Sequence, residues 1–172
     1  GMEISMLEVD GELVYRMNQG KDLLAFLGNK GLDGVVHRPS PMPDKTKLWD
    51  RTEIDDNLKC WCKSVIGGLF YYARGVRWDI SHAVSRIAQT NDNPTAGTVA
   101  ALEWLAGYML STPDFDLVGK VNTGVDVLSI YTDSGHKGDS GFTNRSQSGN
   151  ILCLNGVQIH WRSNRQTSTA VS

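Results

Sequence analysis

The chain has 172 residues, with 17 Lys and Arg against 19 Asp and Glu, a length that fits one domain or two small ones. With 40% apolar and 21% charged residues it is neither a disordered tail nor a membrane protein, and a pI of about 6.1 excludes binding to nucleic acid by bulk positive charge. The three cysteines do not suggest a disulfide framework, and the first residues lack the basic and apolar pattern of a secretory signal. We therefore expect an intracellular protein, cytoplasmic or nuclear and not secreted.

The first segment, residues 1–57, is expected to hold a hairpin, a short helix and a linker. Apolar runs on both sides of Asp10-Gly11 predict two strands within residues 3–18, because Asp-Gly favours a tight hairpin turn. Leucines on one helical face predict a short helix over residues 20–28. Prolines at 39, 41 and 43 mark residues 33–57 as an extended connector, where we place a boundary.

The second segment, residues 58–120, carries the spacing of amphipathic helices. Apolar residues recur at helical intervals over residues 59–73, 79–88 and 94–110. Asp79 favours a helix N-terminus, and Gly67-Gly68 indicates a point of close helix packing. Three helices joined by short links predict a small bundle.

The third segment, residues 121–172, changes to strand patterns. A strand is expected from about residue 125 to Asp133, and residues 149–154 and 157–161 flank Asn155-Gly156, a second two-residue hairpin signal. These strands form an antiparallel meander that needs a further element on its apolar face, so we expect an incomplete domain. The whole chain is accordingly predicted to be of the α+β class: a hairpin, a three-helix bundle and the meander.

Several motifs together resemble a known family. The segment Lys63-Ser-Val-Ile-Gly-Gly-Leu-Phe-Tyr-Tyr-Ala and the segment Tyr131-Thr-Asp-Ser-Gly carry most of the resemblance. Further matches, in chain order, are residues 1–4, 39–43, 74–89, 93–95, 136–139, 145–149 and 159–172. In these motifs the chain resembles Ty1/copia-type retrotransposon polyproteins, from the strand after the palm of the reverse transcriptase, through its thumb and connection helices, to the first three strands of an RNase H-like domain.

The resemblance implies RNA-directed DNA synthesis and cleavage of RNA–DNA hybrids for the parent family, but only part of the chemistry for this chain. No Tyr-x-Asp-Asp occurs, and Asp55-Asp56 lies in a polar linker. RNase H chemistry needs several carboxylates that hold two Mg²⁺ ions, and Asp133 matches the first of them. Asp133 is thus our candidate catalytic residue and partial Mg²⁺ ligand, while Asp139 is read as a turn residue. We expect the chain alone not to cleave and not to bind Mg²⁺ tightly.

Nucleic-acid contact is predicted separately, because it needs cations rather than carboxylates. The third helix has no basic residue within residues 99–110, and Trp78 replaces the proline usual in the family; both are departures from the family pattern. The remaining candidates for phosphate contact form two groups, one on the helices and one near the meander: Arg74, Arg77 and Arg86, then Arg145, Arg162 and Arg165. Their alternative interpretation is ordinary solvated surface charge. We expect weak binding of RNA or of an RNA–DNA hybrid.

Other chemistry-bearing residues favour structural roles. His136 and His160 are interpreted as surface or packing residues, and Cys60 and Cys62 diverge on a helix, while Cys153 lies in another element, which argues against zinc. The alternative functions are a protein-interaction or self-associating module that uses the uncovered sheet edge, and a nuclease completed by a partner. The expected partners are nucleic acid, the rest of the polyprotein or a second copy, and no membrane.

Overall fold

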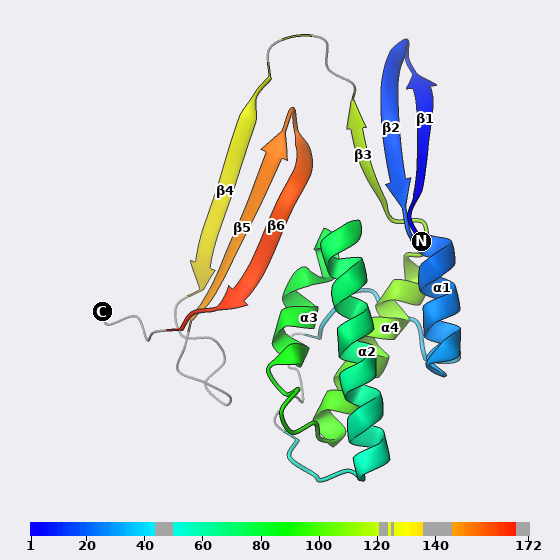
Figure 1. Cartoon of the computed structure of the whole chain (residues 1–172), viewed down its shortest axis with the longest axis vertical. Helices are drawn as coiled ribbons and strands as arrows, with labels where there is room; N and C mark the ends of the chain where they lie inside the picture. Colours follow the sequence, from blue (N-terminus) through cyan, green and yellow to red (C-terminus); the bar gives the residue numbers. More distant parts are fainter. Residues whose placement is uncertain (44–49, 121–123, 125, 136–145, 168–172) are drawn as a thin grey trace. The chain divides into compact units, whose positions relative to one another are not determined.

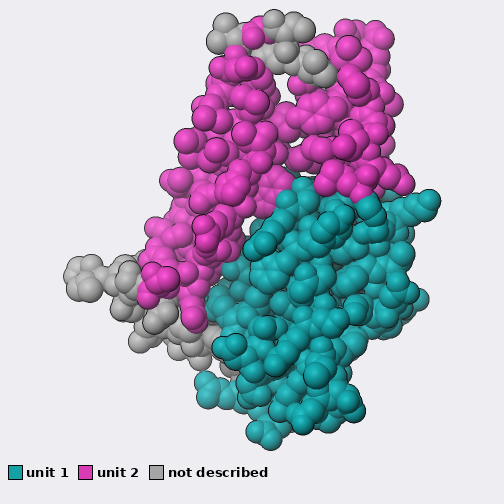
Figure 2. Space-filling model, viewed as in Figure 1, with its two compact units in different colours: residues 1, 19–115 teal, residues 2–18, 116–172 magenta. Residues whose placement is uncertain are grey.

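A computed structural model describes residues 1–43, 50–120, 124, 126–135 and 146–167 (Figure 1). The chain divides into two compact units, which Figure 2 colours separately: unit 1 holds residue 1 and residues 19–115, and unit 2 holds residues 2–18 and 116–172. Within the described residues, unit 1 is helical and unit 2 contains two antiparallel three-stranded sheets. The predicted α+β class is confirmed.

Unit 1 consists of α1 (Gly20–Asn29), α2 (Asp56–Gly75), the short 3-10 helix η1 (Trp78–Ile80), α3 (Ser81–Ala88) and α4 (Ala96–Ser111). The side chain of Asp55 accepts a hydrogen bond from the backbone N–H of Leu58 at 3.0 Å, which caps the first turn of α2. At the start of α4 the backbone N–H of Thr95 donates to the hydroxyl oxygen of Thr98 at 3.0 Å. The helices predicted from apolar spacing are confirmed, with ends that differ by a few residues.

The core of unit 1 lies among these helices. Leu102 and Leu105 of α4 are fully buried, as are Val65 of α2 and Leu27 of α1. Burial of each such side chain contributes about 1.5–3 kcal/mol, which makes this apolar cluster the main stabilising feature of the unit.

The proline-rich segment packs on α4. The backbone N–H of Arg38 donates to the carbonyl of Gly107 at 3.2 Å, and the indole of Trp104 donates to the carbonyl of Ser40 at 2.9 Å. The Arg38 guanidinium also stacks over the Trp104 ring at 4.1 Å. A Cβ on Gly107 would lie 2.1 Å from the carbonyl oxygen of Val36, so the close approach requires glycine. The described part of the segment therefore belongs to the helical unit.

One sheet of unit 2 has the strand order β1-β2-β3, formed by β1 (Glu3–Val9), β2 (Glu12–Asn18) and β3 (Asp116–Lys120). Asp10 and Gly11 have φ values of 53° and 80°, as the predicted two-residue hairpin requires. Strand β3 was not expected from the sequence. It pairs with β2 and places Gly119 beneath the ring of Tyr15.

The other sheet of unit 2 is the predicted meander, formed by β4 (Leu128–Gly135), β5 (Gln147–Leu154) and β6 (Val157–Arg165). Asn155 and Gly156, with φ values of 52° and 82°, close the hairpin between β5 and β6. A bulge lies opposite Leu152 and Cys153. At one end of the meander the strands are longer than the apolar pattern indicated. Backbone pairing continues through polar residues to Gly135 of β4, Gln147 of β5 and Arg165 of β6.

The two units divide the chain differently from the three consecutive segments, 1–57, 58–120 and 121–172, that we expect from the sequence. The N-terminal hairpin belongs with β3, about 100 residues later, while α1 and the proline-rich segment belong with the later helices. The difference arises because β3 pairs at long range, which no local signal reveals.

Candidate nucleic-acid interface

One face of α2 carries exposed cations and aromatic rings at helical spacing. Lys63, Gly67, Tyr71 and Arg74 follow one another at intervals of four, four and three residues, and all are exposed. Residues at these intervals lie on one side of an α-helix. Tyr71 is 51% exposed, and Phe70 beside it is partly buried. We call this set, Lys63, Gly67, Phe70, Tyr71 and Arg74, the α2 face.

The adjacent glycines of α2 have opposite surroundings. A Cβ on Gly68 would lie 2.3 Å from the Phe26 ring, so Gly68 is the packing glycine that the sequence indicated. A Cβ on Gly67 would meet nothing within 4 Å. Gly67 is therefore not needed for packing, and it leaves the helix backbone open between Lys63 and Tyr71. An extended ligand can approach the helix closely at that point.

The charge of the α2 face is positive. Lys59, one turn before Lys63, pairs with Asp56 at 3.6 Å. Within the described residues, no ion pair is found for Lys63 or Arg74. The Arg74 guanidinium lies 5.3 Å from the centroid of the Phe70 ring, a cation–π contact that holds it on this face. The face thus offers one cation at each end, Lys63 and Arg74, and the exposed ring of Tyr71 between them.

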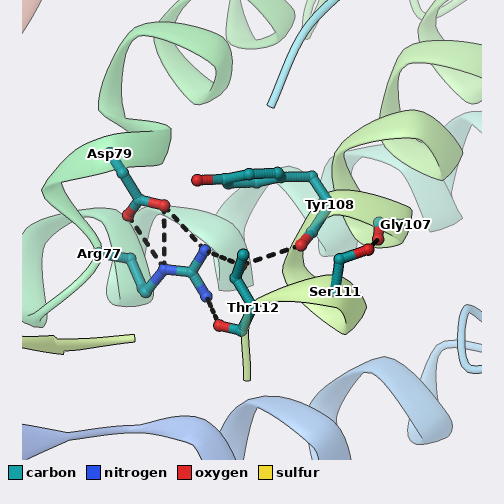
Figure 3. Close-up of polar contacts among 6 residues, drawn as sticks. All are labelled: Arg77, Asp79, Gly107, Tyr108, Ser111 and Thr112. Carbon is teal, nitrogen blue, oxygen red and sulfur yellow. Dashed lines mark hydrogen bonds and ion pairs between the residues drawn. The ribbon is translucent and has the colours of Figure 1, made fainter. Parts of the chain in front are cut away.

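Arg77 is not available to a ligand, contrary to our expectation. Its guanidinium lies in the interior of unit 1, donating to both oxygens of the Asp79 carboxylate at 2.8–3.3 Å (Figure 3). It also donates to the carbonyl and hydroxyl oxygens of Thr112, at 2.9 and 2.7 Å. The rings of Tyr108 and Phe115 lie within 6 Å of it. Arg77 therefore ties the turn after α2 to the end of α4, and it is only 1% exposed.

Arg86 lies on α3 and is half buried. It faces His82, and burial first, with the charge of Arg86 second, lowers the pKa of that imidazole. Arg86 is therefore a less accessible candidate for phosphate contact than Arg74.

The arginines near the meander do not form one patch. Arg162 pairs in register with Asn150, and Arg165 pairs with Gln147, so the two side chains leave opposite faces of the sheet. Both are exposed. Arg145 lies outside the described residues, as do His136 and Asp139. The expected second group of phosphate contacts thus reduces to two separate arginines in the described part of the chain.

Asp133 is exposed near the end of β4. It pairs in register with Gly149, which pairs with Ser163, so these three residues form one row across the sheet. Arg165, Tyr131 and Trp161 belong to the same face, in neighbouring rows. Among the residues that the structure describes, no group of three or more His, Cys, Asp or Glu could hold a metal ion. Gly149 and Ser163 are not the carboxylates that a pair of Mg²⁺ ions requires, so the described residues do not fit that cofactor.

The cysteines differ in accessibility. Cys60 is exposed, whereas Cys62 is fully buried, and burial raises the pKa of the Cys62 thiol from 9.0 to about 11. Cys153 is buried in β5. All three are free thiols.

Lys63, Gly67 and Tyr71 were not predicted from the sequence as candidate ligand contacts. A helical projection of α2 would have found them, because the spacing of four, four and three residues is visible in the sequence. Only arginines were predicted as phosphate contacts, so Lys63 was left out. Gly67 and Gly68 were both interpreted as packing residues, so the open position at Gly67 was not recognised.

Three curated proteins are similar to this chain. The retrovirus-related Pol polyproteins from transposons RE1 and RE2 of Arabidopsis thaliana are 31% and 32% identical to it, over 84% and 76% of the chain. These two similarities support a retrotransposon polyprotein origin for the chain. It covers only 10% and 9% of those two polyproteins. No protein-family model and no solved structure matches the chain.

The third relative corrects our expectation of localisation. The secreted RxLR effector protein 161 of Plasmopara viticola is 31% identical over 109 residues, which are 63% of this chain and 75% of the effector. Because this relative is named as a secreted protein, the expectation of an intracellular, non-secreted protein is contradicted. Separately, no helix among the described residues has the length and apolar character needed to cross a membrane.

Proposed function

We propose that this chain is the part of a Ty1/copia-type Pol polyprotein that holds nucleic acid during RNA-directed DNA synthesis. In this proposal unit 1 corresponds to the thumb and connection helices of the reverse transcriptase. The observation that carries the proposal is the α2 face, where Lys63 and Arg74 flank the open backbone at Gly67 and the exposed ring of Tyr71. The similarity to two Pol polyproteins supports the proposal but does not establish it, because the chain spans about a tenth of their length.

The dimensions of the α2 face suit a polynucleotide. Lys63 and Arg74 are 11 residues apart, so their Cα atoms are separated by roughly 16 Å along the helix at about 1.5 Å per residue. Because each strand carries one phosphate per ~3.4 Å of helix axis, both cations reach the same strand across several nucleotides. Tyr71 lies between them and supplies a surface for a sugar or base.

The β4-β5-β6 meander completes the proposal as the first strands of an RNase H-like domain. Asp133, on an exposed face near the end of β4, is the residue that would serve as its first carboxylate. Since the described residues around it do not fit two Mg²⁺ ions, we propose no cleavage step for them. Nucleic-acid binding by unit 1 is independent of that chemistry.

The test is binding of a fluorescent RNA–DNA hybrid, followed by anisotropy at several salt concentrations. We expect the Lys63→Ala/Arg74→Ala variant to bind more weakly and to reduce the slope of log affinity against log salt by about 2, one unit per lost phosphate contact. The matched control is Lys21→Ala/Arg51→Ala, which removes two exposed cations of unit 1 outside the α2 face. We expect the control to leave the slope nearly unchanged.

Two outcomes contradict the proposal. Equal weakening in both double variants would mean that the chain binds through diffuse charge and not through the α2 face. An unchanged affinity of Lys63→Ala/Arg74→Ala would remove this face from the interface altogether.

A further inference from the structure

The β1-β2-β3 sheet of unit 2 has an unprotected edge at β1. Among the residues that the structure describes, strand β1 pairs with β2 on one side only, and all seven of its residues are exposed. Ile4 is 67% exposed and Met6 is 61% exposed. Edge strands of natural proteins are commonly protected by lysine, proline or a bulge, and β1 contains none of these. The edge is therefore competent to pair with a further strand.

The charge of this sheet is concentrated at the same edge. Its two cations, Arg16 and Lys120, are already paired with Asp116 of β3 and Glu12 of β2. The remaining carboxylates, Glu3, Glu8 and Asp10, lie on β1 and in its turn, and no ion pair is found for them within the described residues. The free edge is thus apolar and anionic at once.

These two properties restrict the occupant. A polynucleotide or an anionic lipid surface would be repelled by the carboxylates of β1. A second copy of β1 would bring the same uncompensated carboxylates to the interface. An extended polypeptide strand with apolar residues between lysines or arginines meets all three requirements. It hydrogen-bonds to the free backbone groups of β1, packs on its apolar side chains and neutralises its carboxylates.

We propose that β1 is a docking edge for a basic, extended segment of a protein partner, which adds a fourth strand to the β1-β2-β3 sheet. In the antiparallel register, basic residues of the partner lie opposite Glu3 and Glu8, five positions apart, and apolar residues lie opposite Ile4, Met6 and Leu7. This role uses a surface in unit 2 and does not depend on the α2 face of unit 1.

The test uses the full chain and a labelled peptide, Thr-Lys-Val-Ile-Thr-Val-Lys, whose lysines fall opposite Glu8 and Glu3. We expect saturable binding by anisotropy and slower hydrogen exchange of the β1 amides in the complex. The Glu3→Lys/Glu8→Lys variant should bind this peptide at least about tenfold more weakly and should instead bind the peptide with glutamates in place of both lysines. The matched control, Glu53→Lys/Glu103→Lys, changes the net charge equally at exposed positions of unit 1 and should bind like the unaltered chain.

Absence of peptide binding overturns the proposal. Equal loss in both charge-reversed variants overturns it as well, since the effect would then be one of net charge. If the β1 amides become protected only with increasing concentration of the chain itself, the occupant is a second copy and the proposed partner is wrong. Protection confined to β4 or β6 would place the peptide on the other sheet and would equally refute a β1 docking edge.

Discussion

The helical unit and the strand unit of this chain use apolar residues in opposite ways. In unit 1, the large apolar side chains of the described residues are mostly buried or packed against the buried core, and only Leu24, Val36 and Tyr71 are exposed. In unit 2, exposed large apolar side chains occur on all six strands, with Ile4, Val118 and Ile130 among them. Unit 1 closes its own core, whereas the sheets of unit 2 present surface that is suited to contact with something else.

This comparison separates two kinds of charged residue as well. The cation that unit 1 buries, Arg77, is satisfied by Asp79 and Thr112 and holds helices together. The cations that it exposes on the α2 face have no such role. Burial and hydrogen bonding, and not the residue type, therefore decide which arginines are candidates for binding.

Arg77→Met should cause the largest loss of stability. It leaves the half-buried Asp79 carboxylate and the Thr112 carbonyl without their donor, and breaking a buried ion pair in this way costs about 3–5 kcal/mol. The measurement is urea unfolding followed by the helical circular dichroism signal. Arg74→Met, three residues earlier and exposed, is the matched control and should change the stability by less than about 0.5 kcal/mol. Similar effects of the two variants would show that Arg77 is not a structural residue.

Leu102→Ala and Ile130→Ala should differ sharply, although each removes a large apolar side chain. Leu102 is 0% exposed and its loss leaves a cavity in the unit 1 core, at a cost of about 2–5 kcal/mol. Ile130 is 60% exposed, and we expect a change within about 0.5 kcal/mol. The measurement is the free energy of unfolding of each variant, with unit-specific hydrogen exchange to assign the change. A costly Ile130→Ala would mean that the meander has a closed core of its own.

The buried thiol of Cys62 should make unit 1 less stable at high pH. Burial raises its pKa to about 11 from 9.0, so the folded state favours the neutral thiol. The neutral thiol's contribution to the free energy of unfolding is complete below pH 9 and is lost as the pH rises toward 11. The loss is roughly 2–3 kcal/mol, at about 1.36 kcal/mol for each unit of pKa difference. The difference in unfolding free energy between the unaltered chain and Cys62→Ala, measured from pH 8 to 11, isolates this effect from the tyrosines. A constant difference over that range would contradict it.

Glycine substitutions should give the smallest effects, with opposite signs. Gly107→Ala forces the proline-rich segment away from α4, because its Cβ would meet the Val36 carbonyl, and overpacking of this kind costs about 1–3 kcal/mol. Gly67→Ala meets nothing and should stabilise α2 by about 0.5–1 kcal/mol. Thermal unfolding of both variants checks the signs. In the binding assay with the RNA–DNA hybrid, Gly67→Ala should nevertheless weaken binding, because the added methyl group covers the helix backbone that the proposed ligand approaches.

The elements with local signals were predictable from the sequence. The hairpins at Asp10-Gly11 and Asn155-Gly156 are encoded by residues that adopt positive φ readily, and the helices by apolar spacing. Strand β3 was not predictable, because its partner β2 lies about 100 residues away and its own sequence has few apolar residues. The sequence also could not show that Arg77 is buried, because the oxygens of Thr112 that accept its hydrogen bonds lie 35 residues later, at the end of α4. For the candidate site, Arg74 was named from the sequence as a candidate phosphate contact and is exposed, whereas the residues that surround it on the α2 face were not named.

Native-state hydrogen exchange resolved along the chain tests the difference between the two units most directly. If unit 1 closes its own core, the amides of α2 and α4 exchange only through unfolding of the whole unit, and those of β1 and β4 exchange through openings of much lower free energy. The predicted result is a clear gap between the two sets, measured on the unaltered chain without ligand. Protection of β1 and β4 equal to that of α2 and α4 would contradict the account, because it would show that the sheets are as firmly closed as the helical core.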